Sequence, residues 1–215
     1  MSERCLIISG GSLEPSPYYK RLAAAYPYVI CADGGARYAA ALGIIPQLVL
    51  GDFDTLSEQE IAHLEQAGTR IQRYSPEKDF TDTHLAILEA LQLGFTEIDL
   101  IAALGGCFGH TLANVMLLAL PEAAHARLRI LEEDQEIFLV RNKKTLTGRV
   151  GERITLLPLT DRVEGITLTG LKFPLTKAVM TLGVSIGVSN AFAQETAQIE
   201  LEKGILVAIQ QRKKT

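Results

Sequence analysis

The stretch Leu48-Val-Leu-Gly-Asp-Phe-Asp-Thr55 decides much of the expected fold, because it reads as a short buried strand that stops at Gly51 and is followed by two aspartates. In an extended chain residues i and i+2 point to the same side, so Asp52 and Asp54 are expected to lie close together. Two such carboxylates repel each other, whereas a hard cation such as Mg²⁺ prefers oxygen ligands of this kind. Aspartate is also common where strands end, which leaves a simple turn as the alternative. The pattern favours a metal site.

Other acidic residues repeat this arrangement along the chain. Five aspartates follow a predicted strand or begin a predicted helix: Asp33, Asp52, Asp54, Asp79 and Asp82. In a parallel α/β sheet such positions gather along one edge, outside the carboxyl ends of the strands, where ligands bind. The i, i+3 spacing of Asp79 and Asp82 places both on one helix face, although an N-cap at Asp79 or Thr81 is the alternative. Lys78 is either a surface charge or a phosphate partner, and the clustered acids favour the second interpretation.

The order of predicted elements indicates the fold class. Apolar strand-like runs and helical segments alternate about five times in the first 120 residues, which predicts an α/β domain with a mostly parallel sheet and helices on both faces. The glycine turns do not match G-x-G-x-x-G, so a dinucleotide site has little support. From about Leu128 short β-type runs alternate with glycine turns, which predicts an all-β sandwich. We place the two domains at 1–125 and 126–215.

Two further turns contain polar residues that could bind ligands. Gly105-Gly106 leads to His110 at a predicted helix start, where free N–H groups and the helix dipole suit a phosphate. A capping or packing role for His110 is the alternative. Ser189 and Asn190 lie in the β-rich part, and on composition alone they are ordinary turn residues.

Composition and charge exclude several classes of protein. Hydrophobic residues make up 47 % of the 215 residues, which is enough for a sizeable core. The formal net charge of −4 argues against a nucleic-acid partner, and no apolar run approaches the roughly 20 residues of a membrane span. The three cysteines lack C-x-x-C spacing and the N-terminus lacks a signal-peptide pattern. We therefore expect reduced thiols in a cytoplasmic protein without a membrane partner.

The motifs, taken in order, resemble those of the thiamine pyrophosphokinase family. They are Asp33-Gly-Gly, Gly51-Asp-Phe-Asp54, Lys78-Asp-Phe-Thr-Asp82, Gly105-Gly with His110-Thr-Leu-Ala-Asn114, and Gly187-Val-Ser-Asn190. The resemblance covers nearly the whole chain and implies an α/β domain, a β-sandwich domain and a homodimer with active sites at the subunit interface. The implied reaction transfers the diphosphate of ATP, with Mg²⁺, to the hydroxyethyl oxygen of thiamine. The products are thiamine diphosphate and AMP.

The resemblance also implies a role for each motif residue. The catalytic residues would be Asp52, Asp54, Asp79 and Asp82, and the Mg²⁺ ligands among them Asp52, Asp54 and Asp82. The ATP site would be formed by Asp33, Gly34, Gly35, Lys78, Thr81, Gly105, Gly106 and His110. Ser189 and Asn190 would contact thiamine. The sequence does not identify which aspartate acts as general base.

One motif departs from the family pattern, which usually reads Gly-Gly-Arg-x-Asp-His. Here Cys107 replaces the arginine and Gly109 replaces the aspartate. An arginine that stabilises phosphate charge is worth about 10³–10⁵ in rate in some phosphoryl-transfer enzymes. Two alternatives therefore stay open: a diphosphotransferase with another heterocyclic alcohol as acceptor, and a catalytically silent protein that binds nucleotide or thiamine compounds. A cation that reaches the turn at Cys107, such as Arg127, Arg129 or Arg141, would argue against the silent protein.

Overall fold

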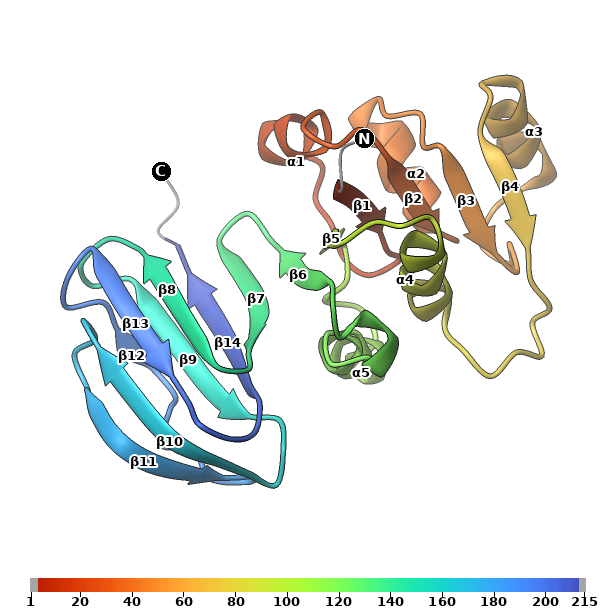
Figure 1. The fold of residues 1–215 in the computed structure, drawn as a ribbon. Coiled ribbons are helices and arrows are strands. Elements are labelled where there is room, and N and C mark those ends of the chain that lie inside the picture. The colour runs from red at the N-terminus through yellow and green to blue at the C-terminus, as the bar shows by residue number, and fades with distance from the viewer. Residues whose placement is uncertain (1–3, 213–215) are drawn as a thin grey trace. The chain divides into compact units, whose positions relative to one another are not determined.

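The computed structural model describes residues 4–212, and the chain divides into two compact units between Glu132 and Glu133 (Figure 1). The first unit is an α/β structure and the second contains only strands. This confirms the predicted fold class. The boundary predicted between residues 125 and 126 precedes strand β6 (Arg127–Leu131).

A parallel sheet forms the framework of the first unit. Its elements are β1 (Arg4–Ile8), α1 (Pro17–Ala23), β2 (Val29–Ala32), α2 (Gly35–Leu42), β3 (Leu48–Gly51), α3 (Glu58–Gln66), β4 (Arg70–Arg73), α4 (Asp82–Gln92), β5 (Glu97–Ile101), α5 (Phe108–Leu117), the 3₁₀ turn η1 (Pro121–Ala123) and β6. The strand order is β6-β5-β1-β2-β3-β4, and every paired neighbour runs parallel. The order reverses at β1, because the chain moves outward from β1 to β4 and then crosses to β5 on its other side.

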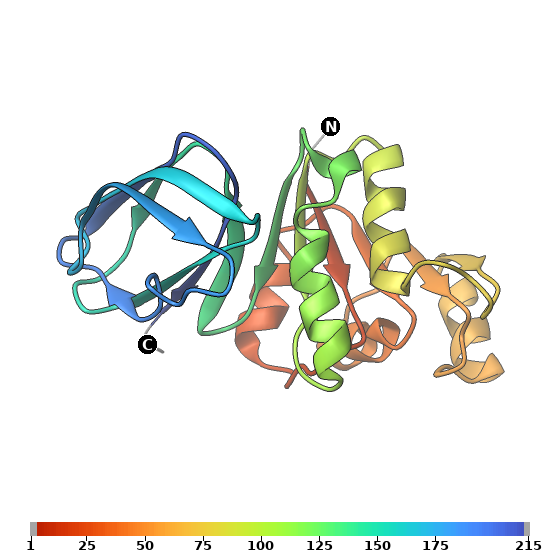
Figure 2. The same ribbon diagram turned by 90° about the horizontal axis from the view of Figure 1, so that it is seen from below.

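Apolar residues on both faces explain why helices cover both sides of this sheet. One face packs against α1, α2 and α3 through alternating residues such as Leu6, Cys31 and Val49. The intervening residues, among them Ile7 and Ile30, are fully buried as well, and α4 packs against β1, β2 and β3. Figure 2 shows the sheet of this unit between its helices. Near-continuous apolar strands are typical of a parallel sheet buried on both faces.

Local signals in the sequence set most of the helix ends. Ser57 caps α3 and forms a capping box with Glu60. Gly43 ends α2 in the left-handed conformation. The predicted helix start at His110 was wrong, because α5 begins at Phe108, and the helix ends at Leu117. Cys107 is the N-cap there, and its carbonyl accepts the first helical hydrogen bond from Thr111.

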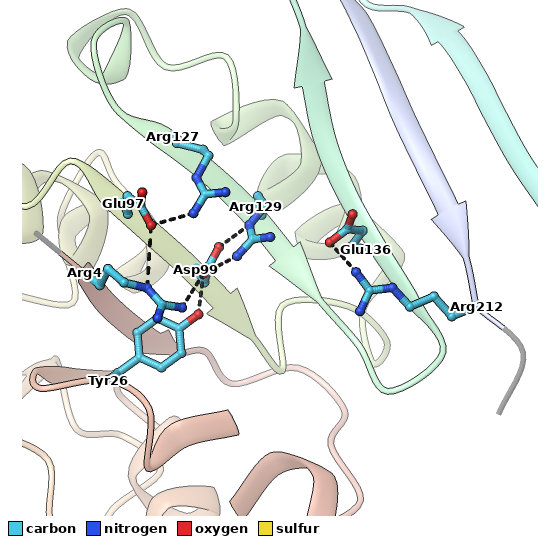
Figure 3. Close-up of polar contacts among 8 residues, drawn as sticks. All are labelled: Arg4, Tyr26, Glu97, Asp99, Arg127, Arg129, Glu136 and Arg212. Atoms are coloured by element: carbon cyan, nitrogen blue, oxygen red, sulfur yellow. Dashed lines mark hydrogen bonds and ion pairs between the residues drawn. The ribbon is translucent and has the colours of Figure 1, made fainter. Parts of the chain in front are cut away.

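A buried charge lies in the middle of β5. Asp99 is 1 % exposed and accepts two hydrogen bonds of 2.7 Å from Arg129 and another from the hydroxyl of Tyr26 (Figure 3). Arg4 stacks on the Tyr26 ring at 4.4 Å and lies 4.0 Å from the Asp99 carboxylate. Burial and the hydrogen bond to Asp99 raise the pKa of Tyr26 to about 12. These contacts join β1, β5, β6 and the end of the α1 segment.

The second unit is a sandwich of two antiparallel sheets. Its strands are β7 (Gln135–Val140), β8 (Lys143–Thr147), β9 (Arg153–Pro158), β10 (Arg162–Thr169), β11 (Leu175–Thr181), β12 (Asn190–Ala191), β13 (Thr196–Glu200) and β14 (Leu206–Gln211). One sheet has the order β12-β9-β14-β7 and the other β11-β10-β13-β8. Alternating residues from both sheets, such as Leu156 and Ile199, form one core. At the end of β14 Arg212 pairs with Glu136 at 2.9 Å, as Figure 3 also shows.

Helices α1 to α5 and η1, which lie within residues 4–212, all fall short of the length and apolar character needed to cross a membrane.

We predict that Asp99→Ala lowers the free energy of unfolding by about 3 kcal/mol or more, because it leaves Arg129 without its buried partner. Urea denaturation followed by circular dichroism measures this loss. The control is Glu58→Ala, which removes an exposed partner of Arg73 and is expected to cost less than about 1 kcal/mol. Equal small losses in the two variants would contradict a stabilising role for the Asp99 contacts.

Candidate active site

A cavity of about 350 Å³ opens at the carboxyl ends of the parallel strands. The residues that line it come from the turns after β1, β2, β3 and β5 and from the first turns of α4 and α5: Gly10, Gly11, Ala32, Asp33, Gly34, Asp52, Asp54, Thr55, Thr81, Asp82, Thr83, Ala103, Gly105, Gly106, Cys107, His110 and Asn114. The strand order reverses at β1, next to these turns. In open α/β sheets ligands bind at this position, outside the carboxyl ends of the strands.

Three carboxylates meet in the cavity. Oxygen atoms of Asp33, Asp52 and Asp54 all lie within 4.8 Å of one another, which suits a metal ion. Asp52 and Asp54 are brought together by a turn rather than by extended chain, because Phe53 between them has φ 61°. The Phe53 side chain is buried in the core of the unit. The sequence therefore predicted that these two residues would meet, but the local geometry differs from the one expected.

Asp33 lies deepest of the three carboxylates. Its side chain is 8 % exposed, and one oxygen accepts a hydrogen bond of 2.6 Å from Thr55. Burial raises the pKa of the Asp33 carboxyl, although the bonds from Thr55 and from the Gly34 backbone oppose the rise. The other oxygen, Oδ1, is buried without a hydrogen-bond partner among residues 4–212. A buried carboxylate oxygen that lacks a donor is costly unless a ligand reaches it.

Lys78 links two of the cavity's acids. Its ammonium lies 2.9 Å from Asp52 Oδ2 and 3.0 Å from Asp82 Oδ1, and its side chain is only 14 % exposed. The hydrogen bond from Lys78 lowers the pKa of Asp52. Burial raises the pKa of Asp82, with Lys78 opposing the rise. For Lys78 itself burial lowers the pKa, but the two carboxylates outweigh this and the net shift is upward.

Two glycines allow these groups to approach closely. Gly51 has φ 152°, and a Cβ there would lie 2.9 Å from Asp33 Cβ and 3.3 Å from Asp82 Oδ1. The absence of a side chain at Gly51 thus leaves the space that Asp33 and Asp82 share. Gly35 begins α2 outside the cavity lining, and a Cβ there would lie 2.0 Å from the Ile8 carbonyl oxygen. Gly35 therefore lets α2 begin directly against β1.

The glycine turn after β5 forms another part of the cavity wall. Gly105 and Gly106 both have positive φ, and His110 lies in the first turn of α5. Cys107 is exposed, and hydrogen bonds from the backbone N–H groups of His110 and Gly109 lower the pKa of its thiol. The N–H groups of Gly109 and His110, in the first turn of the ten-residue helix α5, therefore bond the Cys107 thiol, and Cys107 lines the cavity.

Sequence reasoning overlooked several residues of the cavity, and each has a reason in the fold. Gly10 and Gly11 follow β1 and carry no charged side chain that would have singled them out. Thr55 holds Asp33 across two strands, and Thr83 donates to the Ser9 hydroxyl at 3.1 Å. Contacts of this kind depend on how strands and helices are aligned in space, which cannot be read from the sequence. Asn114 is buried and lies four residues after His110, on the same face of α5. This i, i+4 spacing was the signal in the sequence that could have identified Asn114.

Five predicted site residues are not among those that line the cavity. Gly35 and Lys78 are two of them, and the other three are Asp79, Ser189 and Asn190. Asp79 is exposed and borders a neighbouring apolar hollow with Phe80 and His84. In the second unit Ser189 is exposed with φ 59°. Asn190 is buried, and its amide bonds both the N–H and the carbonyl of Phe173, at 3.0 and 2.8 Å. The predicted ligand contacts of these residues stay predictions.

Two of the three arginines considered as replacements for the family's arginine are engaged elsewhere. Arg127 lies 2.5 Å from Glu97 and Arg129 is bound to Asp99, both along β5 rather than at its carboxyl end. Among the residues that line the cavity none is lysine or arginine. Lys78 is the cation that contacts the lining, through Asp52 and Asp82.

The fold and cavity define an α/β protein with an acidic cavity at the strand ends, together with a β-sandwich unit. Residues 19–130 match the family described as "Thiamin pyrophosphokinase, catalytic domain", and residues 140–206 match "Thiamin pyrophosphokinase, vitamin B1 binding domain". The chain belongs to the thiamine pyrophosphokinase family.

Individual relatives agree with this assignment. Thiamine pyrophosphokinase of Bacillus subtilis (strain 168) is 29 % identical over 205 residues, which is 94 % of this chain and 96 % of the relative. A crystal structure of the enzyme from Bacillus subtilis superposes with a TM-score of 0.86 at 28 % identity and covers 98 % of this chain and 99 % of that one. A family protein from Enterococcus faecalis gives 0.83 at 29 % identity, with 98 % and 100 % coverage.

We predict that Gly51→Ala lowers the free energy of unfolding by more than about 3 kcal/mol, because the new methyl group adds a clash with Asp33 to an unfavourable φ. The matched control is Gly68→Ala, where φ is 90° but no atom lies within 4 Å of the added Cβ. It isolates the backbone strain, for which we expect about 1 kcal/mol. The losses are measured by urea denaturation. Equal losses in the two variants would show that Asp33 moves away from the added methyl group without loss of stability.

Proposed function

We propose that this chain is a thiamine pyrophosphokinase that transfers the diphosphate of ATP to thiamine in the presence of Mg²⁺. The observation that carries the proposal is the group of three carboxylates, Asp33, Asp52 and Asp54, at the carboxyl edge of the parallel sheet. This group lies within residues 19–130, which match the catalytic domain of the family. The family relationship favours thiamine over the two alternatives, another acceptor and a silent binding protein.

The residues present fit a magnesium ion. Mg²⁺ takes carboxylate and phosphate oxygens, and the buried Asp33 Oδ1 lacks a donor within the described part of the chain. Asp52 and Asp54 would hold the ion together with a third carboxylate. The sequence predicted Asp82 for this third position, and Asp33 is the residue whose oxygens lie close to both. When bound, the ion neutralises charge on the triphosphate and on the leaving AMP.

The chain's own groups would bind and orient the triphosphate. The N–H groups of Gly105, Gly106 and the first turn of α5 suit phosphate oxygens, with His110 beside them. Thr81 caps α4 and presents a second helix start to the cavity. The Lys78 ammonium has three N–H donors; it donates a hydrogen bond to Asp52 and forms an ion pair with Asp82. A remaining donor is suited to a phosphate oxygen.

The transfer itself requires one proton to be removed. The hydroxyethyl oxygen of thiamine attacks the β-phosphorus of ATP, the bond from that phosphorus to the oxygen of the α-phosphate breaks, and AMP leaves with the bonding electrons. The hydroxyl proton passes to a carboxylate. A carboxylate with a higher pKa is the stronger base, and Asp33 would be occupied by the metal ion, so Asp82 suits this step better than Asp52. Phosphoryl-type transfer otherwise depends mainly on positioning and charge neutralisation.

The second unit would supply the thiamine contacts. Ser189 and Asn190 close a segment with several exposed apolar side chains: Leu182, Val184, Ile186 and Val188. Asn190 holds the backbone of Phe173, so we assign it the task of ordering this surface for the vitamin. We also propose that the protein is a cytoplasmic homodimer, and that ATP and thiamine rather than nucleic acid or membrane are its partners. Light scattering of the purified protein tests the dimer.

We predict that the purified protein forms AMP from Mg-ATP only when thiamine is present, and that mass spectrometry identifies thiamine diphosphate. Asp54→Asn and Asp82→Asn are each expected to lower the rate by at least about 10²-fold, because they remove charge that holds the cation and Lys78. Asp161→Asn, an exposed acid of the second unit, serves as the control and should keep the full rate. Saturable binding of thiamine without any AMP would overturn the proposal.

We predict that Cys107→Arg combined with Gly109→Asp raises kcat/KM for thiamine. Cys107 is exposed on the cavity wall, so a guanidinium there can reach a phosphate. Arginines of this kind raise the rate by about 10³–10⁵-fold in some phosphoryl-transfer enzymes. Cys107→Ser is the matched control and should leave kcat/KM near the wild-type value. An unchanged rate in the double variant would mean that existing cations already neutralise the triphosphate.

A further inference from the structure

The position of Lys78 is unusual for a lysine that only binds substrate. Its ammonium lies between carboxylates from two different elements, Asp52 after β3 and Asp82 at the start of α4. The two N···O distances, 2.9 and 3.0 Å, are nearly equal. The side chains of all three residues are mostly buried, with 14 %, 17 % and 25 % exposed. Ion pairs at this depth hold their geometry better than pairs on the surface.

An ammonium that bridges two carboxylates takes the place that a divalent cation would take between them. Phosphoryl-transfer sites often use two metal ions, one on each side of the reacting group. Here Asp52 belongs to two neighbouring groups of charged residues. With Asp33 and Asp54 it belongs to the group of three acids, and with Asp82 it holds Lys78.

A second observation separates the two groups. Asp33 is more than nine-tenths buried, lines the cavity, and its Oδ1 has no hydrogen-bond partner among residues 4–212. Asp82 Oδ1 also lacks a hydrogen-bond partner there, but it forms an ion pair with the Lys78 ammonium at 3.0 Å, whereas no ion pair of Asp33 is found among residues 4–212. The group of Asp33, Asp52 and Asp54 therefore still requires a cation, whereas the pair of Asp52 and Asp82 already has one. The distinction arises from the positions of the atoms and from the fixed charge of Lys78.

We propose that Lys78 is a built-in second cation of the site, so that the chain binds one divalent ion, at Asp33, Asp52 and Asp54. Removal of the Lys78 charge would open a second divalent site between Asp52 and Asp82. The inference rests on the proposed function for its catalytic meaning, namely that the ammonium and one metal ion together neutralise the triphosphate.

The test counts bound metal without requiring turnover. Mn²⁺ alone is titrated into the protein, and the free ion is measured by electron paramagnetic resonance. Wild type is expected to bind one Mn²⁺ per chain and Lys78→Met two, while Lys78→Arg keeps the charge and should bind one. Lys20→Met, an exposed lysine on α1, is the matched control and should also bind one. Circular dichroism establishes that each variant is folded.

A double variant keeps the test decisive if Lys78→Met does not fold. Lys78→Met with Asp82→Asn removes one charge of each sign and should bind a single Mn²⁺. Two ions bound by the wild type, none bound by it, or one bound by folded Lys78→Met would each overturn the inference. A second ion in the double variant would overturn the assignment to Asp82.

The rate of AMP formation provides an independent readout. With saturating Mg-ATP, the rate of AMP formation by Lys78→Met should require one additional free Mg²⁺ ion that the wild type does not require. If thiamine yields no AMP with any variant, the proposed function is wrong while the Mn²⁺ count still tests the role of Lys78.

Discussion

Repulsion between carboxylates is the constraint on which the rest of this site depends. Four acids from the ends of two strands and the start of a helix meet in one small cavity, and such a gathering is unstable without positive charge. The structure compensates it with Lys78 on one side and with a place for a metal ion on the other. Under the proposed function, the same carboxylates that oppose folding would bind the triphosphate through shared cations.

The parallel sheet is what makes this gathering possible. Parallel strands all end at the same edge, so turns that are far apart in sequence come together there. Gly51 leaves room for Asp33 and Asp82, and Phe53 anchors the turn between Asp52 and Asp54 in the core. Within the sheet Asp99 joins β5 to β6 and to the segment after α1, so the strands that bear the site are held by buried polar contacts as well as by apolar packing.

Departure from the family's glycine turn does not leave this cavity without a nearby cation. Arg127 and Arg129 are bound to acids along β5, while Lys78 lies against the carboxylates. The N–H groups at the start of α5 and the glycine turn are retained although Cys107 and Gly109 differ from the usual residues. Among residues 4–212 the cavity lining includes no lysine or arginine, and Lys78 contacts the lining through Asp52 and Asp82.

By itself the sequence determined the fold class, the capping of α3, the family and the acids that gather at the sheet edge, because periodicity, capping and motif order are local properties of the chain. It misplaced the start of α5, where a glycine obscured the cap at Cys107. Only the tertiary structure decided that Asp33 joins Asp52 and Asp54, that Lys78 binds Asp52 and Asp82, and that Thr55 holds Asp33. These contacts depend on strand order and on distances across turns, and no local pattern of residues encodes a distance between strands.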